Sequence, residues 1–320
     1  TKELSYDSLL IATGAAPIVP PWEGIDLQGV GVLRTLTDAR HLLKRLTGTS
    51  IERAVIIGAG YIGLEMAEAL GRRGLEVTVV EKEDGVMGGA EPKITEMVAA
   101  ELEAHGVNLL LSTTVEGFDG KDAQRRSVLT DKGPFEADLA LVSLGVRPRS
   151  ELAAQAGLAL GPAKAIHVDD RQRASQENIW AAGDCAEAFH RVLQKPVFVP
   201  LALGANRQGR VAGTNMAGGD ERFPGIVGSA VTRVFDLAIA RTGIDEKTAE
   251  VEGIAVATTE AKSSSRAHYM PDHGSVWVKI LYRTDDLRLV GAWLCGHDRC
   301  LGKRSDILAT AITANMTVLD

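Results

Sequence analysis

A glycine-rich run with the spacing Gly-x-Gly-x-x-Gly lies at residues 58–63 and constrains the fold more than any other feature of the chain. It follows the apolar run 54–57, which is typical of a buried strand, and it opens a helical pattern that extends to about Arg73. A second apolar run, Val77–Val80, is followed by Glu81, close to the ~20 residues after the loop at which such units carry an acidic side chain. This order predicts a βαβ unit that binds a dinucleotide.

Each residue of the motif has a physical task in that interpretation. Gly58 permits the tight turn, Gly60 lets the backbone approach a pyrophosphate, and Gly63 lets the helix pack close to the strand. The helix that begins at Tyr61-Ile62 offers unpaired N–H groups and the positive end of its dipole to the phosphates. The alternative is a strand–turn–helix in which the glycines serve packing alone.

Glu81 predicts which nicotinamide cofactor is preferred. A carboxylate there accepts both hydroxyls of an adenosine ribose and repels a 2′-phosphate, so NAD(H) is favoured over NADP(H). Lys82 is the reason to keep NADP(H) as the less favoured alternative, because a neighbouring cation offsets part of the repulsion.

The order of strand-like and helical patterns predicts an α/β fold with a parallel sheet, followed from Phe223 by an antiparallel sheet. The expected strands are Tyr6–Ala12 (a buried one), Ala54–Ile57, Val77–Val80, Val107–Leu111, Ala137–Leu144, Ile179–Ala182, Ser229–Phe235, Ile239–Thr242, Val276–Tyr282 and Leu287–Trp293. The expected helices are Asp38–Leu46, the helix after the glycine loop, Ile94–His105, Leu203–Met216 and Lys303–Asn315, with a short one after Pro148.

Composition excludes several classes of partner. The net charge of −7 argues against a nucleic-acid or anionic-membrane partner, because either favours a basic face. The apolar runs are too short to span a bilayer, and no signal-peptide pattern opens the chain. Three cysteines do not make a disulfide scaffold, so we expect a reducing, cytoplasmic setting.

The first residues of the chain predict whether the sequence is complete. The chain opens with Thr1 and almost at once enters the strand-like run Tyr6–Ala12. A domain that begins in a buried strand lacks a partner for it, so we expect the sequence to be an N-terminally truncated part of a longer protein.

Five segments, in order, resemble one protein family: "YDSLLIATGAAP", "VIIGAGYIGLEMAEAL", "IWAAGDCAEA", "PLALGANRQGRVAGTNMAGG" and "GSAVTRVFDLAIARTGI". They are similar to the FAD-dependent pyridine nucleotide–disulfide oxidoreductases. Within that family, "YMP" at 269–271 and "GKRSDILATAITANMTV" resemble the branch of coenzyme A-disulfide reductases, NADH oxidases and NADH peroxidases.

The resemblance implies Rossmann-like FAD and NAD(P) domains plus an α+β dimerisation domain at the C-terminus. The implied FAD domain is split, at 1–36 and 148–222. The NAD domain, 37–147, is inserted between its parts, and residues 223–320 form the dimerisation domain of a homodimer.

The same resemblance implies site residues. The implied NAD-binding residues are Gly58, Gly60, Tyr61, Ile62, Gly63, Glu81 and Gly145. The implied FAD-binding residues are Ala12, Thr13, Gly14, Gly183, Asp184, Leu201 and Ala202. In the family, Tyr61 would be a gate over the flavin and Glu65 a nicotinamide contact; without the resemblance, the tyrosine is a packing residue and the glutamate a solvated helix charge. Asp184 is alternatively a turn or helix-capping residue.

The implied activity passes hydride from NADH to FAD and on to a disulfide, persulfide or oxygen-type acceptor, most like a coenzyme A-disulfide reductase. The alternatives are an NADH oxidase or peroxidase of the same branch, or a non-enzymatic NAD(H)-binding protein. The family's redox cysteine precedes the residues in hand, so the chain as printed is expected to bind FAD weakly and to lack disulfide reduction.

Two features depart from the pattern of the family. Cys295 and Cys300 have the spacing of a redox pair, but they follow a strand of the implied dimerisation domain, and we expect incidental thiols and no metal site even with His297 between them. Tyr269 is the implied substrate-facing residue, and Met270 departs from the Tyr-Tyr-Pro of the branch, which weakens the coenzyme A-disulfide assignment.

Overall fold

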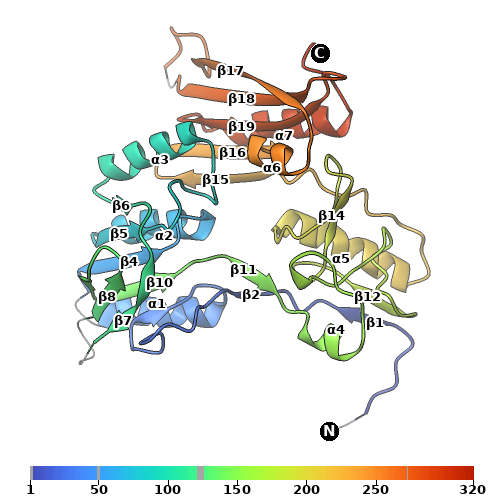
Figure 1. The fold of residues 1–320 in the computed structure, drawn as a ribbon, viewed down its shortest axis with the longest axis horizontal. Helices are drawn as coiled ribbons and strands as arrows, with labels where there is room; N and C mark the ends of the chain where they lie inside the picture. The colour runs from blue at the N-terminus through green and yellow to red at the C-terminus, as the bar shows by residue number, and fades with distance from the viewer. Residues whose placement is uncertain (1–2, 49–50, 121–125, 272) are drawn as a thin grey trace.

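The computed structural model describes residues 3–48, 51–120, 126–271 and 273–320. A five-stranded parallel sheet lies on the left of Figure 1, in the order β3-β10-β4-β5-β6. Its strands are β3 (Val30–Gly31), β10 (Leu139–Val142), β4 (Arg53–Ile57), β5 (Glu76–Val80) and β6 (Asn108–Leu110), joined by α1 (Leu36–Gly48), α2 (Tyr61–Gly71) and α3 (Pro92–Ala104). The predicted α/β class is confirmed.

The strand order places a switch point between β4 and β10. From β4 the chain proceeds to β5 and β6 on one side, whereas β10 and β3 lie on the other side. In open parallel sheets, ligands bind beyond the carboxyl ends of the strands at such a point. The glycine loop follows β4, so it lies at this crevice.

A small antiparallel sheet is attached to the parallel one and was not predicted. It consists of β7 (Val115–Asp119), β8 (Arg126–Thr130) and β9 (Phe135–Ala137). Phe118 and Val128 pack into one apolar cluster with Val55 and Ile57 of β4. The sheet therefore covers one face of the parallel sheet.

The right side of Figure 1 is built from segments far apart in the sequence. There β1 (Leu9–Ile11) pairs in parallel with β12 (Ile179–Ala181), and α5 (Ala202–Met216) contacts β12. The connection to the left side is the antiparallel pair β2 (Ala15–Pro17) and β11 (Val146–Pro148). The remaining elements on this side are α4 (Glu151–Gln155), the 3₁₀ helix Pro162–Lys164, β13 (Ala188–His190) and β14 (Lys195–Val197).

The prediction of a buried strand over Tyr6–Ala12 is wrong in extent and in burial. The strand has three residues, and Leu9 and Leu10 remain 37% and 36% exposed. On one side it pairs with β12, and no other described strand is paired with it.

The C-terminal part is an antiparallel sheet, β15-β16-β19-β18-β17, as predicted from the change of pattern. Its elements are β15 (Ala230–Val234), β16 (Leu237–Gly243), α6 (Glu246–Val251), β17 (Val256–Ser264), β18 (Ser275–Arg283), β19 (Leu289–Gly296) and α7 (Leu301–Thr313). The sequence predicted neither β17 nor α6. The last strand extends to Gly296, so Cys295 lies within it, not after it as expected.

The hairpin between β15 and β16 docks the C-terminal sheet onto α2 and α3. The backbone N–H of Phe235 donates to Glu68 Oε2 at 2.7 Å, and the N–H of Asp236 donates to Glu101 Oε1 at 2.8 Å. Phe235 adopts φ +49, unusual for a bulky residue, while its ring stacks on His105 at 3.9 Å. The junction is thus held by carboxylates of one region and backbone donors of the other.

Among the described residues, the helices are all too short or too polar to cross a membrane.

Candidate dinucleotide and flavin sites

The three glycines of the loop have three different surroundings. Gly58 has φ +104, and a Cβ there would lie 2.6 Å from the Ser143 carbonyl oxygen. A Cβ on Gly63 would lie 1.9 Å from the carbonyl oxygen of Gly58. Gly60, in contrast, has no heavy atom within 4 Å of its Cβ position. Two glycines are therefore needed by the protein's own packing, and the third faces open space.

That open space fits a pyrophosphate. Gly60 caps α2 without a side-chain hydrogen bond, and the N–H groups of a first helical turn have no partner within the helix. These donors and the positive end of the helix dipole are directed toward the approach that Gly60 leaves open.

Glu81 is held at the loop by the backbone. Its Oε2 accepts a hydrogen bond from Ala59 N at 2.8 Å, and its Oε1 accepts one from Glu83 N at 3.0 Å. Lys82, Glu83 and Asp84 are exposed around it. The local charge is therefore negative despite the lysine, which opposes a 2′-phosphate.

Ser143, which sequence reasoning missed, ties the loop to β10. Its hydroxyl lies 3.1 Å from the Ile57 carbonyl oxygen and 3.0 Å from that of Gly58. Gly145 follows with φ +89, and its carbonyl oxygen accepts from Ile18 N. The sequence did offer a signal for Ser143, because it is a polar residue directly after the buried strand β10.

Tyr61 and Glu65 lie on α2 and both face the C-terminal sheet. The Tyr61 side chain is half-buried, and its burial raises the pKa of the phenol, although the positive charge of Arg241 acts in the opposite direction. Glu65 Oε1 accepts from the Thr232 hydroxyl at 3.1 Å. Ile62 is 39% exposed beside them.

The predicted flavin-side residues come together although they are distant in the chain. The pairing of β1 with β12 sets Ala12, Thr13 and Gly14 beside Gly183 and Asp184, and Ala182 N donates to Ile11 O at 3.1 Å. Gly14 and Gly183 have φ +70 and φ +84. Leu201 caps α5, which begins at Ala202, so this helix also presents its N-terminus.

Arg34 joins these segments and was not predicted. Its guanidinium contacts Asp184 Oδ2 at 2.9 Å, and its Nε lies 3.4 Å from the Ala15 carbonyl oxygen. The Asp184 carboxylate is thus a charged contact between two segments, not only a turn residue.

Cys295, Cys300 and Tyr269 lie outside both sites, whereas Cys185 is packed beneath the flavin-side turns. Cys185 is buried, with its thiol near the carbonyl oxygens of Ile11 and Ala182. Burial raises the pKa of Cys295 to about 12, whereas Cys300 is exposed at the start of α7. Tyr269 is 87% exposed between β17 and β18. The pKa of Cys295 makes a reactive thiolate there unfavourable.

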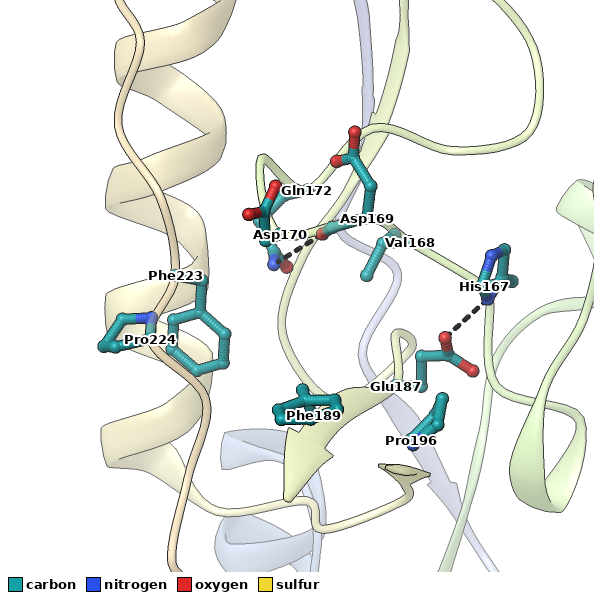
Figure 2. A pocket seen from close by; sticks show the side chains of 10 residues that line it. All are labelled: His167, Val168, Asp169, Asp170, Gln172, Glu187, Phe189, Pro196, Phe223 and Pro224. Carbon is teal, nitrogen blue, oxygen red and sulfur yellow. Dashed lines mark hydrogen bonds and ion pairs between the residues drawn. The ribbon is translucent and has the colours of Figure 1, made fainter. Parts of the chain in front are cut away.

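A separate cavity of about 380 Å³ lies on the right side of the molecule. Figure 2 shows Phe189, Phe223 and Pro196 on its walls, with His167 contacting the buried Glu187 carboxylate at 2.6 Å. None of the predicted site residues lines it.

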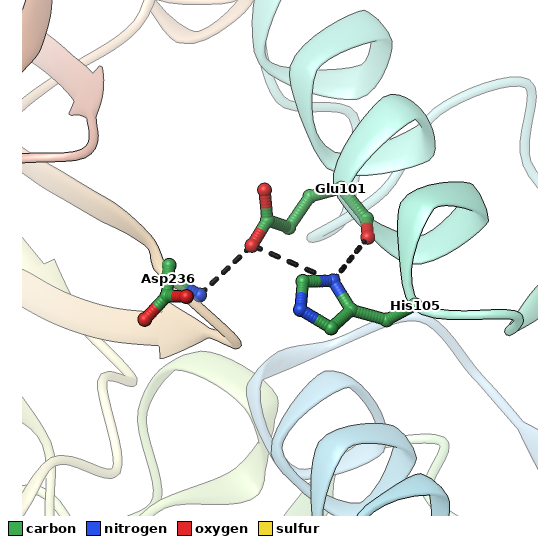
Figure 3. A group of neighbouring side chains, drawn as sticks. All are labelled: Glu101, His105 and Asp236. Atoms are coloured by element: carbon green, nitrogen blue, oxygen red, sulfur yellow. Dashed lines mark hydrogen bonds and ion pairs between the residues drawn. The ribbon is translucent and has the colours of Figure 1, made fainter.

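Glu101, His105 and Asp236 bring potential metal ligands within 4.8 Å of one another (Figure 3). Both Glu101 carboxylate oxygens are already engaged, Oε1 by Asp236 N and Oε2 by His297 Nε2 at 3.0 Å. Protein contacts therefore account for this cluster, which belongs to the hairpin junction.

Comparison with known proteins decides the family. The family model of the pyridine nucleotide-disulphide oxidoreductases matches residues 1–209, and the model of that family's dimerisation domain matches residues 229–320. The chain belongs to this family. The resemblance stated from the sequence is confirmed.

The similar relatives carry two kinds of name. The "NAD(P)H sulfur oxidoreductase (CoA-dependent)" of Pyrococcus abyssi is 37% identical over 320 residues, covering 100% of this chain and 71% of the relative. An "NADH oxidase" of Methanocaldococcus jannaschii is 37% identical over 311 residues, 97% of this chain and 68% of the relative.

A solved NAD-dependent persulfide reductase from A. fulgidus superimposes with a TM-score of 0.95 at 40% identity. It matches 99% of this chain, and this chain spans 59% of that protein's length.

Proposed function

We propose that the protein is an FAD-containing NADH oxidoreductase that reduces a sulfur acceptor, of the disulfide or persulfide type. The observation that carries the proposal is the glycine loop. Gly60 leaves the approach to the α2 N-terminus open, and Glu81 is fixed beside it by Ala59 N. The names of the similar sulfur oxidoreductase and persulfide reductase support the acceptor class.

The residues of the loop would bind and orient the nicotinamide dinucleotide. The first turn of α2 would hold the pyrophosphate, and Glu81 would accept the ribose hydroxyls. Tyr61, at the start of the same helix, would cover the flavin until a nicotinamide enters, and Glu65 would contact that ring. We propose the predicted division into domains together with these roles.

The flavin-side segments fit an FAD. The Thr13-Gly14 and Gly183-Asp184 turns follow the paired strands β1 and β12, and a Cβ on Gly183 would lie 3.6 Å from the Cβ of Ala205, in the first turn of α5. The positive end of that helix dipole favours a negative charge nearby. When bound, flavin would take hydride from NADH and pass electrons to the acceptor. Asp184 would accept a ribityl hydroxyl, in competition with its contact to Arg34.

Cofactor discrimination tests the site. We expect NADH to bind at least ten-fold tighter than NADPH, a difference of about 1.4 kcal/mol or more, because a 2′-phosphate would meet Glu81, Glu83 and Asp84. Glu81→Gln should narrow the ratio of NADPH Kd to NADH Kd, whereas Glu76→Gln, at the opposite end of the strand that Glu81 follows, should leave this ratio unchanged. Titration calorimetry at low salt measures both ratios. Equal affinities in the unaltered protein would contradict this use of Glu81.

NADH oxidase is the second candidate, favoured by the name of the M. jannaschii relative. Anaerobic NADH oxidation with coenzyme A persulfide or polysulfide should exceed the rate with oxygen alone. A faster reaction with oxygen would favour the oxidase, and binding of NADH without turnover would favour the non-enzymatic alternative.

We also propose a homodimer in a reducing, cytoplasmic compartment. The matched dimerisation domain supports the first, and three free cysteines support the second. Light scattering at micromolar concentration tests the dimer.

A further inference from the structure

Lys279 of β18 is a buried cation with carboxylates around it. The residue is only 6% exposed, and its ammonium donates to Glu91 Oε1 at 2.8 Å and to Glu246 Oε2. Glu260 Oε1 lies further away, at 4.0 Å. Burial lowers the pKa of Lys279, but the hydrogen bonds to Glu246 and Glu91 raise it by more, so the side chain is charged. A buried ammonium of this kind is stable only where its partners remain in place.

The contact with Glu91 joins two regions of the molecule. Glu91 directly precedes α3 of the parallel-sheet region, whereas Lys279 belongs to the C-terminal sheet, 188 residues further along the chain. A side chain at the start of a helix commonly accepts from an N–H group of the first turn, but Glu91 makes no such hydrogen bond. Its carboxylate instead turns to the lysine of the other region.

Glu91 ends the segment 82–91, which follows Glu81 and contacts the glycine loop. Met87 N donates to the Ala59 carbonyl oxygen at 2.8 Å. The N–H of the same alanine donates to Glu81 Oε2 at 2.8 Å. Both backbone polar groups of Ala59 are therefore bound by the stretch of chain that begins at Glu81.

The turn in this segment has an uncommon backbone conformation. Met87, Gly88 and Gly89 follow one another with φ +57, +73 and +86. A non-glycine residue keeps a positive φ only where the surrounding structure holds it. Burial of Met87, which is 8% exposed, holds one side of the turn, and the ion pair of Glu91 with Lys279 holds the other.

We propose that Lys279 is a positioning residue for the dinucleotide site and acts through Glu91. The ion pair fixes segment 82–91, and Met87 of that segment fixes the backbone of Ala59. The inference rests on the proposed function, in which the glycine loop binds NADH. Without the ion pair, the segment adopts more conformations in the free protein, and the affinity falls with the fraction of protein in the conformation that binds. The C-terminal sheet thereby contributes to NADH affinity from outside the loop.

The test is a double-mutant cycle on the full-length protein with its flavin, read out as the Kd for NAD⁺, which binds without turnover. Lys279→Met and Glu91→Met each remove one charge and retain a long side chain. We expect each to raise the Kd about three- to ten-fold, and the double variant to bind no more weakly than the single ones. The KM for NADH should rise in parallel, with little change in kcat or in flavin content.

Hydrogen exchange gives a local measurement of the same effect. The Met87 amide should exchange faster in all three variants, because its bond to the Ala59 carbonyl oxygen is formed less often. Lys93→Met is the matched control, because Lys93 is an exposed lysine of α3 that pairs with Glu96. It should change neither the Kd nor the exchange of the Met87 amide.

The double variant separates positioning from a loss of stability. Removing one partner of a buried ion pair leaves an uncompensated charge, whereas replacing both partners by apolar side chains is often neutral. Glu246 is 45% exposed, so water can solvate it once the lysine is gone. We therefore expect the double variant to be more stable to urea than Lys279→Met, while its Kd stays raised.

A Kd that returns to the unaltered value in the double variant would overturn the proposal, as would effects of the two substitutions that simply add, or an unchanged Kd in either single variant. If Lys279→Met does not fold, as judged by circular dichroism, Glu91→Met, in which Lys279 keeps its contact with Glu246, decides the question alone. Failure of the unaltered protein to bind either NAD⁺ or NADH would instead contradict the proposed function.

Discussion

The glycine loop and the region where α2 meets the C-terminal sheet are adjacent but are built in opposite ways. The loop is mostly local: the Glu81 carboxylate and the Ala59 N–H that it accepts from are 22 residues apart, and Ser143 is the contact that comes from further along the chain. The junction is not, since Thr232 and Glu65 are 167 residues apart, and Arg34 and Asp184 on the flavin side are 150 apart. Backbone from one stretch of chain makes most of the first site, whereas side chains from separate regions make the others.

Because of this difference, we expect the two regions to tolerate different substitutions. A site made mostly of neighbouring backbone is sensitive to atoms added at its closely packed glycines, and depends less on the packing of distant parts. A site assembled from distant segments depends on the burial and protonation of the side chains that join them. The following changes test this distinction, from the largest expected effect to the smallest.

Gly63→Val should be the most damaging change in the loop. Even the first carbon of the new side chain would lie 1.9 Å from the Gly58 carbonyl oxygen and 2.9 Å from Ser143 Oγ, so α2 has to move away from β4. We expect the free energy of unfolding to fall by about 3 kcal/mol, measured by urea denaturation. Gly74→Val would be a poor control because of its positive φ, so Gly209→Val on α5, where no atom is within 4 Å, is the comparison. A stability equal to that of the control would show that the loop is not closely packed.

Acid should destabilise a second long-range contact, where His190 of β13 packs against the C-terminal sheet beside Gly228. This ring is 4% exposed, and its Nδ1 accepts from the N–H groups of Val192 and Leu193. Burial, together with the nearby Arg241, lowers its pKa from 6.5 to about 4. The unfolded chain therefore binds a proton that the folded protein does not, and stability present above pH 6.5 is lost as the pH falls toward 4.

The expected loss from this one group is about 3 kcal/mol between pH 7 and pH 4. His190→Gln, which stays neutral and can still accept a hydrogen bond, should flatten this part of the stability profile. His41→Gln, at an exposed position of α1, should not. Identical profiles for all three proteins, measured by denaturation across that range, would rule out His190 as the source.

Gly60→Ala should separate binding from folding within the loop. With φ −80 and no atom within 4 Å of the added carbon, alanine fits without strain. We expect the free energy of unfolding to change by no more than about 0.5 kcal/mol, while NADH affinity falls at least ten-fold, about 1.4 kcal/mol, because the methyl group occupies the phosphate approach. Calorimetric titration measures the affinity. Unchanged affinity would mean that the pyrophosphate does not pass Gly60.

The same contrast explains what the sequence could predict. The strand, loop, helix and acidic residue from Arg53 to Glu81 are specified by neighbouring residues, so periodicity and spacing were enough. Strand β17 was missed because most of its side chains are exposed and give no apolar alternation. The extent of the first strand was overestimated, because an apolar run does not reveal which neighbours bury it.

Contacts between residues far apart in the sequence were also not predicted. Arg34 and Ser143 carry no motif, and their roles follow only from segments that the fold brings together. The flavin-side residues were named by resemblance to a family, not by spacing, and the structure then placed Gly14 beside Asp184 through the pairing of β1 with β12. Physical reasoning on the sequence is thus strongest where partners are close in the chain.

Thr232→Val should give the smallest effect and the one most specific to the junction. Thr232 is 4% exposed and its hydroxyl donates to Glu65 Oε1 at 3.1 Å, while valine fills the same volume. Because Glu65 is exposed and can bind water instead, we expect a loss of only about 1 kcal/mol in the free energy of unfolding. Thr258→Val, at an exposed position of β17, is the matched control and should change stability less.

If Glu65 contacts the nicotinamide as proposed, its release in Thr232→Val should also change the KM for NADH, whereas the ratio of NADH to NADPH affinity, set at Glu81, should stay the same. A change in that ratio would show that the junction and the loop are one coupled site and would remove the distinction between them.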